Sequence, residues 1–139
     1  MKLSGQAKWF MKKQAEEWLK AAADDLKVVE KIQHDESLTN MIAFHAQQAI
    51  EKTLKGILEE FESRVPRIHN LIKLKDLTEK YIELEIDKLS IERLNEIYTD
   101  TRYPSDLGLI PDGKPSLKLA KTFYATAIEV YDVVAKKIL

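Results

Sequence analysis

Apolar residues recur at steps of three and four positions through three long segments of this chain, and no other feature restricts its fold as much. In an α-helix such residues line one face, so each segment is predicted to be an amphipathic helix that buries one stripe. The segments run from about residue 4 to 33, from about 38 to 61 and from about 116 to 138. Polar residues fill the other positions, as expected for helices that share a core.

The middle segment carries small residues at spacings of three or four, namely Ala46, Ala49, Thr53 and Gly56. Small side chains let a neighbouring helix approach closely, so this segment is predicted to be the central helix of a bundle. Gly56 costs about 1 kcal/mol of helix propensity relative to Ala, and close packing would offset that cost.

Two shorter helices are predicted between the long ones, from about residue 69 to 81 and from about 87 or 90 to 99, with Leu77 and Leu89 facing the core. The stretch between them, 82–86, alternates apolar and acidic residues like a strand, but a lone strand would lack a partner, so a helical or irregular link is preferred. The chain has only four Gly and four Pro, too few for the many turns of a sandwich or barrel. The prediction is an all-α protein with a single domain over residues 1–139.

The composition excludes several kinds of site. There are 22 Lys and Arg against 23 Asp and Glu, so only a local patch could bind a polyanion. The absence of cysteine excludes disulfides and thiolate sites, and the three histidines lack the spacing of a zinc site, so neither metal nor cofactor is expected. With no signal peptide and no apolar stretch long enough for a bilayer, the expected location is cytoplasmic.

The long loop at 100–115 contains the first candidate for ligand binding, Arg102. Long loops without periodicity are often functional. Arg102 lies between two aromatic residues, Tyr98 and Tyr103, so its guanidinium could hold a phosphate while a ring stacks on a base. The alternative is that Arg102 ties the loop to a neighbouring aspartate.

Three further residues are candidates for ligand binding. Lys114 and Lys118 lie near the start of the last long helix, where backbone N–H groups favour an anion, although a solvated helix face explains them equally well. His45, in the central helix, could act as a base or donate to a phosphate. The alternative for His45 is a packed residue bonded to a carboxylate or carbonyl.

Polar residues also occur inside the central helix, at Gln47, Gln48 and Glu51. They are predicted to form an interhelical network that fixes register, with Glu51 paired to Lys55 at the i,i+4 spacing. His69 is predicted to flank the third helix.

Four local patterns together resemble a known family. They are Trp18, Ala22 and Asp25 to Lys27; Phe44 to Ala49, followed by Glu51, Lys52, Leu54 and Lys55; His69 to Leu71 with Leu74; and Tyr98 with Thr101 to Pro104. In this order they resemble the HEPN family (higher eukaryotes and prokaryotes nucleotide-binding). The resemblance implies an antiparallel up-and-down bundle of four to five helices, usually a homodimer. It also implies one of three roles: metal-independent ribonuclease in toxin–antitoxin or defence systems, nucleotide- or nucleic-acid-binding module, or partner of a small nucleotidyltransferase.

The chain departs from the family's ribonuclease pattern, in which an Arg is followed four to six residues later by a His. Arg102 is present, but residues 106–109 are Asp, Leu, Gly and Leu. Metal-free RNA cleavage needs one group to accept the 2′-hydroxyl proton and another to protonate the leaving oxygen, roles that suit His. The preferred hypothesis is therefore a nucleotide- or RNA-binding and assembly module, partnered by a nucleotidyltransferase.

Two alternatives stay open. The first is an atypical endoribonuclease in which Arg102 is catalytic and His45 or Tyr103 replaces the missing His. The second is a structural helical interaction protein without a ligand.

Overall fold

The computed structural model describes residues 12–62, 64–99 and 103–139, and these residues form helices with no β-strand among them. The all-α prediction is therefore confirmed. The α-helices are α1 (Lys13–Ile32), α2 (Thr39–Phe61), α3 (Leu71–Thr78), α4 (Lys88–Asn95) and α5 (Leu117–Ile138), with 3₁₀-helices at Glu36–Leu38 and Pro104–Asp106. In the described part of the chain, no helix is long and apolar enough to cross a membrane.

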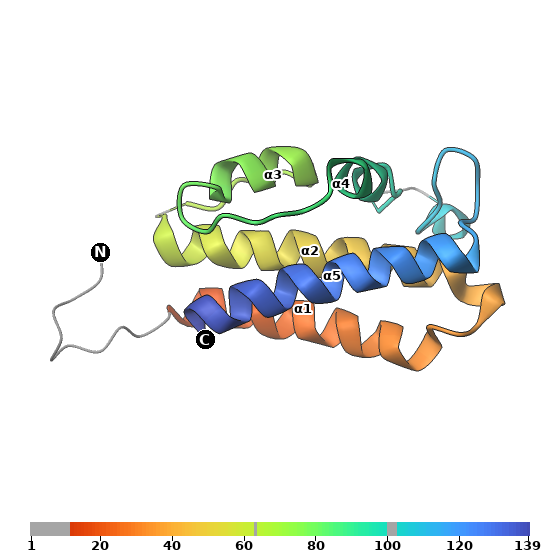
Figure 1. Ribbon diagram of the computed structural model, residues 1–139, viewed down its shortest axis with the longest axis horizontal. Helices are drawn as coiled ribbons and strands as arrows, with labels where there is room; N and C mark the ends of the chain where they lie inside the picture. The colour runs from red at the N-terminus through yellow and green to blue at the C-terminus, as the bar shows by residue number, and fades with distance from the viewer. Residues whose placement is uncertain (1–11, 63, 100–102) are drawn as a thin grey trace, which may run out of the picture.

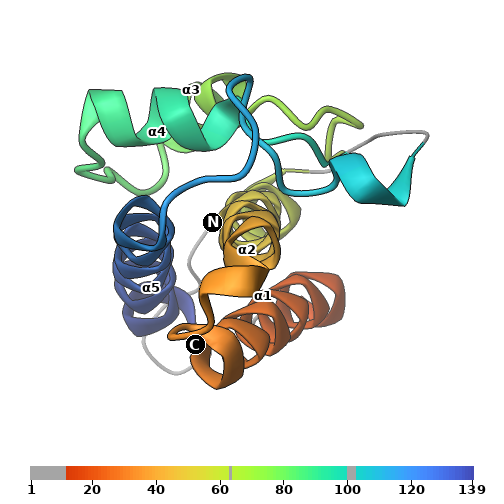
Figure 2. The ribbon, with the colours of Figure 1, turned by 90° about the vertical axis from the view of Figure 1, so that its right-hand side faces the viewer.

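The helices form an up-and-down bundle with α2 at its centre (Figure 1). The chain runs along α1, returns along α2, passes back over the bundle through α3 and α4, and returns again along α5. Viewed along the bundle, α1, α2 and α5 cluster together and α4 lies crosswise over one side of them, above α5 (Figure 2). Helix α2 contacts each of the other four α-helices, so it is the central helix that the sequence predicted.

The small residues of α2 allow α1 to approach closely. Ala46, Ala49 and Thr53 are fully buried. A Cβ atom added to Gly56 would lie 3.2 Å from Leu19 Cδ2, which is tighter than ordinary van der Waals contact. The predicted close packing at Gly56 is thus present, and its partner is α1.

The two short helices are shorter than predicted, chiefly because they end earlier, at Thr78 and Asn95 rather than near residues 81 and 99. Asn70 accepts a hydrogen bond from the backbone N–H of Lys73, and Asp87 accepts one from Ser90, so the helices begin at residues 71 and 88. In helices of two turns only a narrow stripe can face α2, and Leu77 and Leu89 fall outside it. Both are exposed, so the prediction that they face the core is wrong.

The link between α3 and α4 is irregular, as predicted. Its alternation has a physical basis, because Ile82 and Leu84 are buried while Glu83 and Glu85 are exposed. One side of an extended chain thus completes the core without any strand partner.

The connection from α4 to α5 lies directly on the start of α2. The Asn40 side chain donates to the Leu107 carbonyl at 3.2 Å, and Gly108 N–H donates to the Tyr98 carbonyl at 2.8 Å. Gly108 has a φ of 76°, and a Cβ atom there would lie 1.8 Å from the Asn40 carbonyl oxygen. Only glycine fits this position, for reasons of both backbone conformation and space.

We expect Gly108→Ala to lower the free energy of unfolding by at least about 2 kcal/mol, because it combines a disfavoured backbone conformation with a backbone clash. Gly113→Ala is the matched control: its φ is also positive, at 107°, but no atom lies within 4 Å of an added Cβ. The control should cost clearly less in urea-induced unfolding. Equal losses of unfolding free energy in the two variants would show that close contact between the loop and α2 is not the cause.

Candidate functional site

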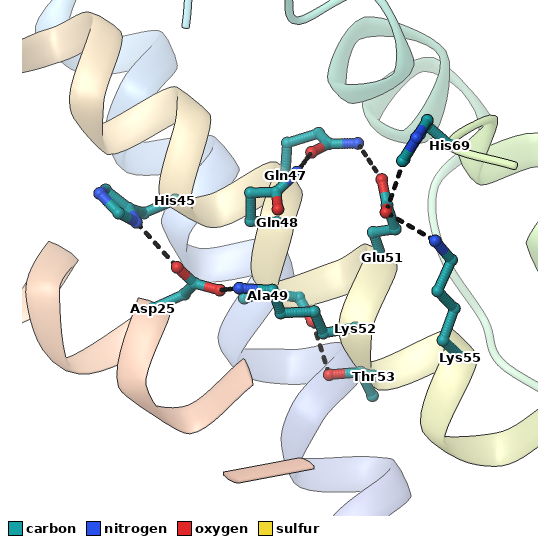
Figure 3. A network of polar contacts seen from close by, with 10 residues as sticks. All are labelled: Asp25, His45, Gln47, Gln48, Ala49, Glu51, Lys52, Thr53, Lys55 and His69. Carbon is teal, nitrogen blue, oxygen red and sulfur yellow. Dashed lines mark hydrogen bonds and ion pairs between the residues drawn. The ribbon is translucent and has the colours of Figure 1, made fainter. Parts of the chain in front are cut away.

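The first polar cluster of the α1–α2 interface is centred on Asp25 (Figure 3). Asp25 lies on α1 and is buried. One carboxylate oxygen lies 2.8 Å from His45 Nδ1, and the other accepts a hydrogen bond of 2.8 Å from Lys52 Nζ. His45 and Lys52 are two turns apart on α2, so both face α1. An ionised carboxylate only accepts hydrogen bonds, so Nδ1 is the protonated nitrogen and His45 presents Nε2 to any further partner.

The second cluster lies on another face of α2 and is centred on Glu51 (Figure 3). Lys55 Nζ and His69 Nδ1 each lie 2.9 Å from one Glu51 oxygen. Gln47 donates to the other oxygen at 3.4 Å and accepts a hydrogen bond from Gln48. The predicted Glu51–Lys55 pair is therefore present. The network is less interhelical than predicted, because Gln47, Gln48, Glu51 and Lys55 bond with one another inside α2, and only His69 joins from outside that helix.

This second ion pair is almost completely removed from water. The side chains of Glu51 and Lys55 are 5% and 7% exposed, whereas His69 is 60% exposed. His69 precedes the N-cap of α3, as predicted, and its bond to Glu51 fastens the segment before α3 to α2. The cluster therefore holds together elements that are distant in sequence.

The loop aromatics are on the surface. Tyr98 and Tyr103 are both exposed, and the Tyr98 backbone N–H donates to the Leu109 carbonyl at 2.9 Å. Arg102, the first candidate from the sequence, lies outside the described residues. The two rings are thus accessible to a ligand.

Lys114 is hydrogen-bonded to the connection between α1 and α2. Its Nζ donates to the Ser37 carbonyl at 2.8 Å. The pKa of Asp35 is lowered, first by the hydrogen bond from the Ser37 hydroxyl and also by the nearby positive charge of Lys114. Lys114 therefore has a structural role at the end of the bundle where the loop docks.

Lys118 lies elsewhere, on the first turn of α5. It lines an open cleft between α4 and α5 together with Arg93, a residue that the sequence analysis did not single out. The two residues are far apart in sequence, and only the packing of α4 over α5 brings them to the same cleft. The described candidates thus fall into three places: His45 at the α1–α2 interface, the tyrosines and Lys114 on the loop, and Lys118 in this cleft.

The described residues contain no group of three or more His, Asp or Glu side chains that could hold a metal ion. The carboxylates of both clusters are instead bound by lysine and histidine.

Together these features define an all-α bundle whose central helix binds two buried carboxylates, Asp25 from α1 and its own Glu51, and supports the last interhelical loop. A family model described as HEPN domain matches residues 15–138. The chain belongs to the HEPN domain family, which indicates in general a function related to nucleotides or RNA. No curated protein and no solved structure matches the chain significantly.

We expect Glu51→Gln to destabilise the protein by about 3–5 kcal/mol, because it leaves the Lys55 ammonium buried without a counter-charge. The double variant Glu51→Gln with Lys55→Met removes that charge too and should recover most of the loss. Chemical denaturation of the wild type and both variants measures this. A double variant as unstable as Glu51→Gln alone would mean that the ion pair is not the cause.

Proposed function

We propose that this chain is a nucleotide- or RNA-binding and assembly module of the HEPN family, which acts as a homodimer alongside a small nucleotidyltransferase rather than as a ribonuclease. The observation that carries the proposal is the placement of its histidines. The chain has three, His34, His45 and His69, and none follows Arg102 in the loop or lies in α5. The proton-transfer group of the family's ribonuclease pattern is therefore missing at its usual position.

The contacts of the other histidines support the same conclusion. His45 and His69 each bind a buried carboxylate through Nδ1. The two bonds lie on different faces of α2. These bonds join α1 and the segment before α3 to the central helix. Both histidines thus have a structural role that accounts for their presence.

Binding without cleavage fits the groups that the surface offers. Tyr103 is 67% exposed, and its aromatic face is suited to stacking on a base. Arg102, its neighbour in sequence, supplies a guanidinium suited to a phosphate. Assembly with a nucleotidyltransferase, and a role in a toxin–antitoxin or defence-like system, rest on the family.

We expect neither the wild type nor Arg102→Ala to cleave mixed labelled RNA in the presence of a metal chelator. The wild type should nevertheless bind the RNA, and Arg102→Ala should bind more weakly, with the salt dependence of binding reduced by about one phosphate contact. Cleavage by the wild type that disappears in Arg102→Ala would overturn the proposal. So would the absence of binding to RNA, to nucleotides and to a nucleotidyltransferase.

One observation favours a second candidate, an atypical metal-independent endoribonuclease. Asp25 fixes the orientation of His45 through Nδ1, an arrangement that prepares the opposite nitrogen, Nε2, to accept a proton. Nε2 would take the proton of a 2′-hydroxyl, the 2′-oxygen would attack the phosphorus, and the bond to the 5′-oxygen would break as that oxygen takes a proton from water. The products would be a 2′,3′-cyclic phosphate and a free 5′-hydroxyl.

If the chain cleaves RNA in this way, His45→Gln should lower the rate by about 10²-fold or more, the usual contribution of a general base. His69→Gln is the matched control, since His69 is also bound to a carboxylate but has no role in this mechanism, and it should cleave normally. Cleavage that persists in His45→Gln would exclude His45 as the base.

A further inference from the structure

An open cleft of about 390 Å³ lies between α4 and the start of α5. It forms because α4 crosses the bundle above the first turns of α5 (Figure 2). A cleft of this size is within the range of small-ligand sites in proteins.

The cleft is positively charged in a protein whose net charge is −1. Arg93 from α4 and Lys118 from α5 line it, and no carboxylate does. Both side chains belong to exposed residues, and neither forms an ion pair with another residue in the described ranges. Two cations that line one cleft without an ion pair to a protein carboxylate favour an anion there.

Between these charges the surface is apolar. Leu119 and the buried ring of Phe123 line the cleft, and Leu89 stands at its rim with 55% of its surface exposed. A simple inorganic anion would gain nothing from these side chains. The cleft therefore suits a ligand that has an anionic group joined to an apolar or aromatic part.

A second cleft, of about 490 Å³, continues from the first and shares Arg93 and Leu119 with it. It adds the apolar residues Ile110 and Pro111 of the docked loop, and two carboxylates, those of Glu96 and Asp112. The combined groove thus has Lys118 in its first cleft, Arg93 and Leu119 where the two clefts meet, and two carboxylates in its second cleft.

We propose that this groove binds a single nucleoside monophosphate unit, either a free nucleotide or the 5′-phosphorylated end of an RNA. The phosphate lies between Arg93 and Lys118, and the base lies against Leu119. The carboxylates of the second cleft accept hydrogen bonds from the ribose 2′-hydroxyl or a base amino group. This inference rests on the proposed function and gives it a ligand class and a place.

Titration of the isotope-labelled protein with AMP, followed by NMR, tests the site. We expect the amide signals of residues lining the groove to shift, and Arg93→Gln with Lys118→Gln to weaken binding by at least about tenfold. The matched control is Arg67→Gln with Lys136→Gln, which removes the same two charges from exposed positions outside the groove and should leave affinity within about twofold. Adenosine, which lacks the phosphate, should bind at least tenfold more weakly than AMP.

Two RNA oligonucleotides of the same sequence, one with a 5′-phosphate and one with a 5′-hydroxyl, distinguish the sources of the ligand. A preference for the 5′-phosphate that disappears in the groove variant would assign the site to RNA ends. Equal affinity for both RNAs, together with AMP binding that the groove variant loses, would assign it to free nucleotide.

AMP signals that shift elsewhere, the absence of AMP binding, or equal losses in the groove and control variants would each overturn the inference. If RNA binding that depends on Arg102 persists in those cases, the proposed function survives without this site. If RNA and partner binding are absent as well, both fail.

Discussion

Helix α2 is covered on nearly every side by the other helices, and this burial dictates how its polar residues must behave. A charge removed from water is costly unless a counter-charge and hydrogen bonds replace the water. Glu51 therefore holds Lys55 and His69, and Asp25 crosses from α1 to hold His45 and Lys52. These charges would be destabilising if they were buried without partners, so their pairing fixes which faces of α1, α2 and the segment before α3 can meet. Packing supplies the stability, and the carboxylates supply the alignment.

The architecture was accessible from the sequence because it depends on local patterns. Periodicity identified three long helices, and the small residues around Gly56 identified the central one. The i,i+4 spacing gave the Glu51–Lys55 pair, since both residues lie on one helix. The lengths of α3 and α4 were not predicted correctly, because apolar residues continue at helical spacing past Thr78 and Asn95, where the two helices end.

The candidate sites were harder to predict, because they depend on contacts between helices. A histidine bonded to a carboxylate was one of the two alternatives for His45, but nothing in the sequence could identify Asp25, twenty residues away on another helix, as its partner. Arg93 was not noticed at all, since it gains significance only when α4 crosses α5 and places it in the same cleft as Lys118. Lys114, which suggested an anion site, instead binds the Ser37 carbonyl. Residue type and spacing therefore suggested which side chains could bind a ligand, whereas tertiary packing decided which side chains and partners come together.

The docked loop between α4 and α5 also has a consequence for the order of folding. Its anchors, Asn40 and Ser37, precede it by 67 and 77 residues, so the loop can settle only after the start of α2 is in place. Contacts that close such long stretches of chain are costly in entropy and form late. The same loop supplies Ile110 and Pro111 to one wall of the groove beside α4. A nascent chain can thus assemble most of the α1–α2 hairpin early, yet it acquires this groove only when its last helix has been made and packed.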